Sequence, residues 1–273
     1  MTTPAIKPVG ASALKSFFGR DAIKNKFSDM MGKKATSFIT TTLQLCTGDD
    51  RLVNATPASV YGAVMTAATL DLPINPNLGF AYIIAYSQKI KGSNPAIYET
   101  VAQFQLGYKG FVQLAQRSGQ VKTISATPIY KGQIVSENPL TGYQFDFSVK
   151  ESDEIIGYAA YIALLNGFEK TSYMSVKDLD IHARKYSQSF KNGFGIWKDN
   201  FEAMAMKTVI KLLLSKYAPL SVDMQKGIEM DQAVIDDTDG FNYVDNEEEI
   251  QEAVDVTAKK NALKEKKNKI ELP

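Results

Sequence analysis

Three polar side chains at four-residue spacing form the first candidate site in this sequence. Lys109, Gln113 and Arg117 are four residues apart, so they share one face if the stretch is helical. Glycines flank Tyr108 and Lys109, and a glycine lets a backbone approach a ligand closely. The N–H groups of a helix N-terminus also attract phosphate. Residues 105–120 therefore suit contact with a sugar-phosphate chain.

The same spacing also fits an ordinary strand–turn–helix corner whose polar edge faces solvent. A short glycine motif discriminates poorly between these two interpretations. Residues 105–120 contain neither G-x-G-x-x-G nor G-x-x-x-x-G-K-[ST], so they do not match either common nucleotide-binding loop. Phosphate contact and a solvated corner both stay open.

A second group of cationic and aromatic residues lies in the C-terminal half. Lys207 and Lys211 are i,i+4 neighbours on a helix expected over residues 197–217. Such a pair usually forms a solvated edge, but this helix is otherwise so apolar that we expect the pair to line a groove. Trp197 opens the helix after a polar, glycine-containing loop at 187–195.

Charge is distributed unevenly along the chain. The 273 residues are 44% hydrophobic and 22% charged, with a net charge of +1, which is typical of a soluble globular protein. Residues 228–255 carry eleven acidic side chains and no Lys or Arg, whereas residues 256–273 carry six Lys and two Glu. Residues 1–227 therefore carry 25 basic and 17 acidic side chains, a net charge of +8. A basic body favours a polyanionic partner, and the acidic segment could compete for the same groove or recruit a basic partner.

Composition also excludes several kinds of chemistry. Cys46 is the single cysteine, so there is neither an intrachain disulfide nor a cysteine-based metal cluster. His182 is the single histidine, and we expect it to be half-exposed on a helix and not catalytic. No apolar run approaches the roughly 18 residues of a membrane span. The N-terminus lacks a hydrophobic signal core, so we expect a cytoplasmic protein without membrane contact.

The elements expected from periodicity and turn signals give an α+β fold. Helices are expected at 20–31, 35–47 and 57–70, and they either complete the core or join copies of the protein. Two strands follow, joined by a long basic connection that is either a solvated loop or a hairpin wedging between bases; its candidate residues are Lys89, Lys91 and Asn94. The strands are expected at 80–87 and 97–104.

The middle of the chain predicts a short sheet followed by helices. Strands are expected at 124–130, 143–149, 155–165 and 168–174. The last two flank Asn166-Gly167, a strong hairpin signal. A capped helix at 175–186 follows. The expected organisation is a flexible arm (1–19), a DNA-binding and oligomerisation core (20–225), an acidic linker (226–249) and a helical or disordered tail (250–273).

Three separated motifs resemble the RecT family of phage single-strand annealing recombinases. They are LDLPINPNLGFAYIIAY at 70–86, QLGYKGFVQLAQRSG at 105–119 and AMAMKTVIKLLLSKY at 203–217. They occur in the family's order, and the resemblance spans roughly residues 20–220. Leu212 departs from it, because many members carry a second basic residue there.

The resemblance implies an antiparallel β-β-β-α annealing-protein core with added N-terminal helices and a long basic C-terminal helix. It implies ATP-independent annealing of single-stranded DNA to give a duplex, in a basic groove of an oligomeric ring or helical filament. It also implies a phage exonuclease as partner and contact of the C-terminal tail with the host single-strand-binding protein. No cofactor is expected beyond Mg²⁺ as a DNA counterion. The residues expected to contact DNA are Tyr108, Lys109, Gln113, Arg117, Lys122, Lys191, Asn192, Trp197, Lys207, Lys211 and Lys216.

Two other classes of protein stay open at this point. A metal-dependent nuclease needs converging carboxylates, and the scattered Asp146, Asp153, Glu154 and Asp178 are the candidates. A purely structural oligomer would have no affinity for single strands at moderate salt.

Overall fold

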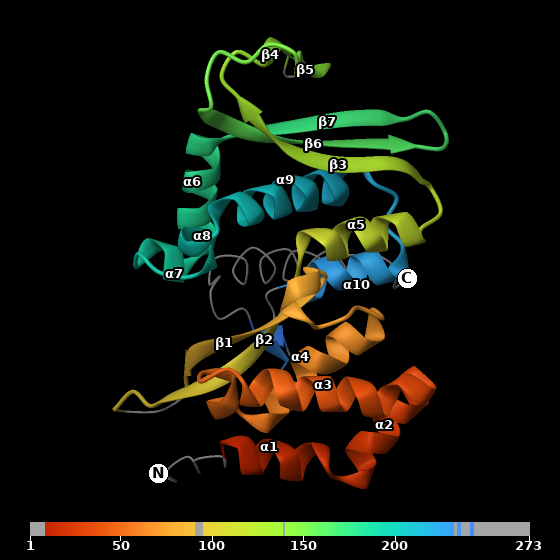
Figure 1. Cartoon of the computed structure of the whole chain (residues 1–273), viewed down its shortest axis with the longest axis vertical. Coiled ribbons are helices and arrows are strands. Elements are labelled where there is room, and N and C mark those ends of the chain that lie inside the picture. The colour runs from red at the N-terminus through yellow and green to blue at the C-terminus, as the bar shows by residue number, and fades with distance from the viewer. Residues whose placement is uncertain (1–8, 91–94, 139, 232–233, 236–240, 243–273) are drawn as a thin grey trace, which may run out of the picture.

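The chain forms an elongated molecule with helices at one end and an antiparallel sheet at the other (Figure 1). The computed structural model describes residues 9–90, 95–138, 140–231, 234–235 and 241–242. A β-hairpin and several helices lie between the two ends (Figure 1). One of them, α10 (Val222–Met230), lies in the middle of the molecule beside α5 (Tyr108–Arg117).

Four helices build the N-terminal end: α1 (Ala11–Phe18), α2 (Asp21–Met31), α3 (Ala35–Thr47) and α4 (Pro57–Thr69), with short 3₁₀ turns at Gly32–Lys34 and Leu52–Asn54. Leu14, Phe18 and Phe27 are buried, and the rings of Phe18 and Phe27 lie 6.2 Å apart. The described part of the predicted arm thus contains a helix, because its apolar face packs on α3 and α4. Residues 1–8 of that arm lie outside the described residues.

The predicted pair of strands forms an antiparallel hairpin of β1 (Ala81–Lys89) and β2 (Tyr98–Leu106). A 3₁₀ turn, η3 (Pro76–Leu78), precedes β1, and α4 packs against both strands. Lys89, the last residue of β1, is exposed. The other two candidate wedge residues, Lys91 and Asn94, lie outside the described residues.

Helix α5 (Tyr108–Arg117) follows β2 as predicted, and its glycines do serve a close approach. The close approach is between α5 and the backbone of Gly79 and Phe80, not between α5 and a ligand. A Cβ on Gly107 would lie 2.2 Å from the Gly79 carbonyl oxygen, and one on Gly110 would lie 2.2 Å from the Phe80 carbonyl oxygen. These positions therefore require glycine so that α5 can pack on the turn before β1.

The main sheet has the strand order β3-β6-β7, from β3 (Val121–Tyr130), β6 (Ile155–Leu164) and β7 (Glu169–Ser175). Its hairpin turns at Gly167, whose φ is +88°, as Asn166-Gly167 predicts. Residues 143–149 do not enter this sheet. Only β5 (Gly142–Phe145) is a strand there, and it pairs with β4 (Ile134–Asn138). The strand ends because the Asp146 carboxylate accepts the backbone N–H of Ser148 at 2.9 Å, which closes a local turn.

Five helices follow the sheet: α6 (Val176–Tyr186), α7 (Gln188–Lys191), α8 (Ile196–Asp199), α9 (Phe201–Tyr217) and α10 (Val222–Met230). The helix predicted over 197–217 is broken at Asn200, whose φ is −148° and whose side chain caps the Ala203 N–H at 3.2 Å. Helix α10 occupies the first part of the predicted acidic linker. Two short strands, β8 (Val234–Ile235) and β9 (Phe241–Asn242), pair with each other, and the predicted tail at 250–273 lies outside the described residues.

One continuous apolar core joins the two ends of the molecule. Helix α9 packs against all three strands of the main sheet and against α5, and most of its apolar side chains are buried. Helices packed on antiparallel strands confirm the predicted α+β class. No helix among the described residues is long and apolar enough to span a membrane.

Candidate nucleic-acid interface

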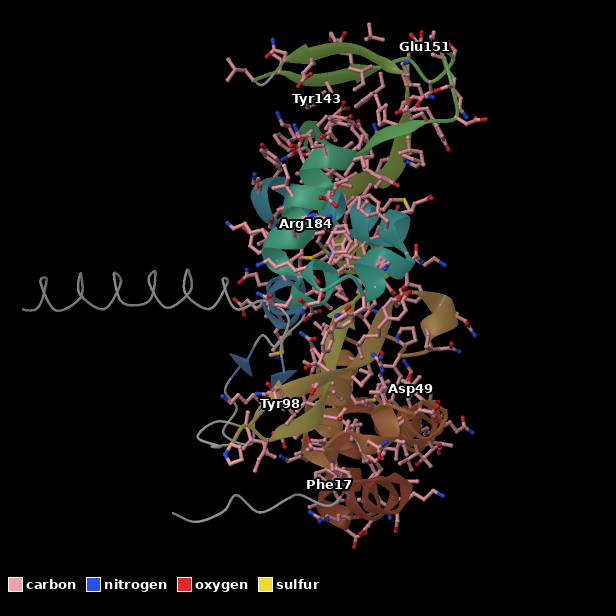
Figure 2. The ribbon with its side chains drawn as sticks, turned by 90° about the vertical axis from the view of Figure 1, so that its left-hand side faces the viewer. Phe17, Asp49, Tyr98, Tyr143, Glu151 and Arg184 are labelled. Atoms are coloured by element: carbon pink, nitrogen blue, oxygen red, sulfur yellow. The ribbon has the colours of Figure 1, made fainter. Side chains whose placement is uncertain are left out.

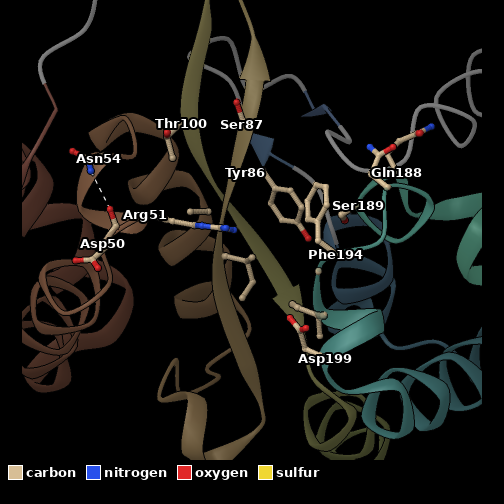
Figure 3. A pocket seen from close by; sticks show the side chains of 15 residues that line it. Asp50, Arg51, Asn54, Tyr86, Ser87, Thr100, Gln188, Ser189, Phe194 and Asp199 are labelled. Carbon is tan, nitrogen blue, oxygen red and sulfur yellow. Dashed lines mark hydrogen bonds between the residues drawn. The ribbon is translucent and has the colours of Figure 1, made fainter.

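A cleft of about 670 Å³ opens between the hairpin and the α7–α8 region (Figure 3). Three segments that are distant in sequence form its walls. The segment after α3 contributes Asp50, Arg51 and Asn54; the hairpin contributes Ile84, Ala85, Tyr86, Ser87 and Thr100; and the α7–α8 region contributes Gln188, Ser189, Asn192, Phe194, Gly195, Ile196 and Asp199. A cleft shared by several packed elements is the usual setting of a binding site.

Two aromatic side chains face this cleft from opposite walls. Phe194 is 54% exposed. Tyr86 is half-buried, and its hydroxyl accepts the Gln105 amide N–H at 3.0 Å. Figure 3 shows both rings directed into the cleft. Aromatic faces of this kind stack on bases without selecting a sequence.

The lining of the cleft carries one cation, Arg51, and two carboxylates, Asp50 and Asp199. Lys89, Lys191 and Lys198 are exposed, and each lies within two residues of a lining residue. The Lys198 ammonium donates to the Gly193 carbonyl at 2.8 Å, so it lies against the loop that presents Phe194.

The residues predicted in the 187–197 region have different surroundings. Asn192 lines the cleft and Lys191 is exposed beside it. Trp197 is only 6% exposed, and its ring lies 5.6 Å from Phe201 and 6.2 Å from Phe190. A ring this buried does not stack on a base in this arrangement. Trp197 holds α8 in place, so its predicted groove-shaping role is the one that the geometry permits.

The polar stripe of α5 does not face the cleft, because α5 and α7 lie on opposite sides of the molecule (Figure 1). Lys109 is exposed, whereas Tyr108 is half-buried against the core. The Gln113 Oε1 atom is buried and accepts no hydrogen bond from the residues that the structure describes. Arg117 donates to the carbonyl oxygens of Leu70 at 2.6 Å and Asp71 at 2.8 Å. In this structure Arg117 therefore binds the end of α4.

The lysine pair of α9 is covered. Lys207 is 6% exposed, and its ammonium lies 2.9 Å from the Asp231 carboxylate, which also lies 3.1 Å from Lys211. Burial opposes ionisation of Asp231, but the two lysines outweigh it and hold the pKa of the carboxyl below its ordinary value. In this structure a carboxylate from the end of α10 covers Lys207, and the expectation that the pair lines a groove for DNA stays a prediction.

The remaining predicted residues lie near the ends of other elements. Lys122 on β3 and Lys216 at the end of α9 are both exposed. Figure 2 shows the side of the molecule that carries α6–α8 and the hairpin, with Arg184 above and Tyr98 below. Tyr98 is 63% exposed. The predicted residues thus occupy at least three separate places, and their contacts with DNA stay predictions.

Comparison with known proteins assigns the chain to a family. The model of the RecT family matches residues 33–256. The chain belongs to the RecT family. It is 42% identical over 238 residues to the uncharacterised protein YqaK of Bacillus subtilis (strain 168), covering 87% of this chain and 78% of the relative. It is also 26% identical over 255 residues to Protein RecT of Escherichia coli (strain K12), covering 86% of this chain and 89% of that protein.

The single histidine of this RecT-family chain lies behind the cleft, on α6. The His182 ring is 4.6 Å from Tyr186 and 6.5 Å from Trp197. Burial, with smaller contributions from Lys211 and Lys185, lowers its pKa from 6.5 to about 4. His182 is therefore neutral at neutral pH and is half-buried by aromatic rings, in keeping with a packing role.

The carboxylates considered for a nuclease do not converge. The Asp146 carboxylate is hydrogen-bonded by Ser148, and Asp153 pairs with Lys150. Asp178 accepts the Ser175 hydroxyl at 2.7 Å, at the N-terminus of α6. Within the part of the chain that the structure describes, no group of three or more His, Cys, Asp or Glu residues could hold a metal ion.

Sequence reasoning missed three residues of this RecT-family cleft: Arg51, Tyr86 and Phe194. Tyr86 lies in a strand that was predicted, and Arg51 lies between two predicted helices, but nothing local indicates that either meets the α7–α8 region. Phe194 did carry a signal, because a phenylalanine between Gly193 and Gly195 sits in a polar loop with no apolar period to bury it.

Proposed function

We propose that this RecT-family protein anneals complementary single strands of DNA without ATP, in phage-type homologous recombination. Family membership over residues 33–256 carries the proposal. The exposed Phe194 ring of the cleft and the exposed lysines close to it in sequence support the proposal, because single-strand binding without sequence preference combines a cationic groove with stacking platforms.

In the proposed mechanism the first strand lies across the cleft with its phosphates near Lys89, Lys191 and Lys198. Neutralising phosphates releases counterions, so binding weakens steeply with salt. Phe194 and Tyr86 support the bases from within the cleft. Contacts to backbone and base faces carry little sequence information, so Watson–Crick edges stay free to test an incoming strand.

Assembly into a ring or helical filament follows from this mechanism, because one cleft is short compared with a strand that must find its complement. A row of identical subunits holds a longer strand extended. The phage exonuclease that supplies single strands is a further proposed partner, and the C-terminal tail is proposed to contact the host single-strand-binding protein. Mg²⁺ has the proposed role of a DNA counterion only.

The test is an annealing assay with labelled complementary oligonucleotides, without ATP and with Mg²⁺ or Mn²⁺ present. We expect duplex formation above the spontaneous rate and intact strands. Cleavage of the strands would support a nuclease instead. A structural oligomer would give neither annealing nor binding.

Matched variants test the cleft itself. Phe194→Ala should weaken single-strand binding at least several-fold, since base stacking contributes about 1–3 kcal/mol per base. Lys191→Ala should weaken it because one phosphate contact is lost. The controls are Phe168→Ala, an exposed ring at the β6–β7 turn, and Lys131→Ala, an exposed lysine beside Glu151. Equal losses of affinity in the cleft and control variants would show that DNA does not bind in the cleft.

A further inference from the structure

One buried carboxylate joins three elements at the centre of the molecule. Asp231, at the end of α10, is 1% exposed, and its two oxygens separately contact Lys207 at 2.9 Å and Lys211 at 3.1 Å. The oxygen that contacts Lys207 also accepts the backbone N–H of Leu106 at 2.9 Å. Leu106 is the last residue of β2. Helix α9, strand β2 and the segment after α10 are therefore held together by one anion.

The partners of Asp231 have the chemistry of a phosphate site. A phosphodiester carries one negative charge shared by two free oxygens, as a carboxylate does. Two ammonium groups and one backbone N–H, directed at one anion, are the contacts that proteins make to phosphate oxygens. Buried ion pairs add little stability over apolar packing of the same volume, so stability alone does not account for two lysines around one carboxylate.

The anion comes from the acidic segment of the chain. Asp231 is the second of eleven acidic residues within 228–255, a stretch without Lys or Arg. Helix α10 packs on α5 and β2, and β8 packs on α4 and β2. The end of α10 is further held where the Thr66 hydroxyl contacts the Met230 sulfur at 3.5 Å. The acidic segment thus supplies the carboxylate that contacts Lys207 and Lys211.

We propose that Lys207, Lys211 and the Leu106 N–H form a binding site for a nucleic-acid phosphate, and that Asp231 occupies this site in the free protein as an internal competitor. The proposal rests on the proposed function and adds a regulation to it. A DNA phosphate enters from the side of Lys211, whose side chain is 23% exposed, and displaces the Asp231 carboxylate.

The first test compares Asp231→Asn with Asp223→Asn in the full-length chain. Asparagine keeps the shape and the Leu106 hydrogen bond of Asp231 but removes its charge. Asp223, in the exposed first turn of α10, gives the same change in net charge without touching the lysines. The readout is anisotropy of a labelled oligothymidine strand over a salt series.

We expect Asp231→Asn to bind the strand about three to ten times more tightly than Asp223→Asn. We also expect a steeper salt dependence, by about 0.7 in the logarithmic slope for each lysine that gains a phosphate. Thermal melting checks that both variants are folded. Equal affinities and equal slopes for the two folded variants would overturn the proposal.

The second test uses the wild-type chain, so it does not depend on how well Asp231→Asn folds. Hydrogen exchange of the backbone amides of α10 is measured with and without the strand. We expect faster exchange in Val222–Met230 when DNA is bound. If the strand binds and anneals but protection of α10 is unchanged or greater, only this inference fails. If no strand binds to wild type or to either variant, the proposed function fails and this inference fails with it.

Discussion

Arg117 gives the sharpest contrast between a contact predicted from sequence and one found in the structure. Its guanidinium donates to the carbonyl oxygens of Leu70 and Asp71 at 2.6 and 2.8 Å and lies 3.8 Å from the Asp71 carboxylate. Asp71 has a φ of +46°, the left-handed conformation that commonly ends a helix. A cation at this point also complements the negative end of the α4 dipole. Arg117→Ala removes all of these interactions.

The size of the expected loss follows from those contacts. Hydrogen bonds from charged groups contribute about 1.5–3 kcal/mol each. The Arg117 side chain is 32% exposed, however, so in the variant water partly replaces its hydrogen bonds to the two carbonyl oxygens. We therefore expect Arg117→Ala to lower the free energy of unfolding by about 2 kcal/mol. For a chain of this size each kcal/mol lowers the melting temperature by about 2–4 °C.

Urea unfolding followed by circular dichroism measures this change. The control is Arg184→Ala, because Arg184 forms an exposed pair with Asp180 at 2.7 Å within α6, and such pairs contribute about 0.5 kcal/mol or less. If Arg117→Ala unfolds like wild type yet binds single strands more weakly, the structural role is wrong and the DNA contact predicted from sequence is right.

Three further predictions follow from the packing and charge of other residues. Gly107→Ala should lower the free energy of unfolding by about 3 kcal/mol or more, because the added Cβ meets backbone atoms. The control is Gly119→Ala, which has open space around it but a φ of +68° and should cost about 1 kcal/mol. Equal losses would contradict the close packing of α5. The pKa of His182 is lowered in the folded protein, so its contribution to the free energy of unfolding is complete above pH 6.5. This contribution is lost as the pH falls toward about 4, by about 2–3 kcal/mol. His182→Gln should flatten that part of a stability–pH curve, and an unchanged curve would refute the assignment. Lys191→Ala should lower the logarithmic salt slope of single-strand binding by about one unit, and no change in slope would exclude a phosphate contact there.

Local signals predicted much of the fold. The Asn166-Gly167 hairpin, the helix capped by Ser175 and the hairpin of β1 and β2 all depend on neighbouring residues, and all are present. Local chemistry also explains one failure. Alternation at 143–149 predicted a long strand, but Asp146 and Ser148 form a side-chain turn that ends it.

Tertiary contacts account for what the sequence did not predict about the site. Lys207 has the spacing of a surface lysine, but it is buried and contacts Asp231, which lies 24 residues further along the chain. Trp197 was a candidate for stacking, but aromatic neighbours from three different segments enclose it. The cleft was not predicted for the same reason, because residues around 51, 86 and 194 come together only in the folded chain.

The most direct test of the central claim is a structure of the assembled protein with two complementary strands added in succession. We expect the first strand to cross the cleft between β1 and α7–α8, with Phe194 against its bases and Lys191 near its phosphates. We expect the second strand to pair with outward base edges. A paired or single strand held elsewhere on the molecule, with the cleft empty, would contradict the account.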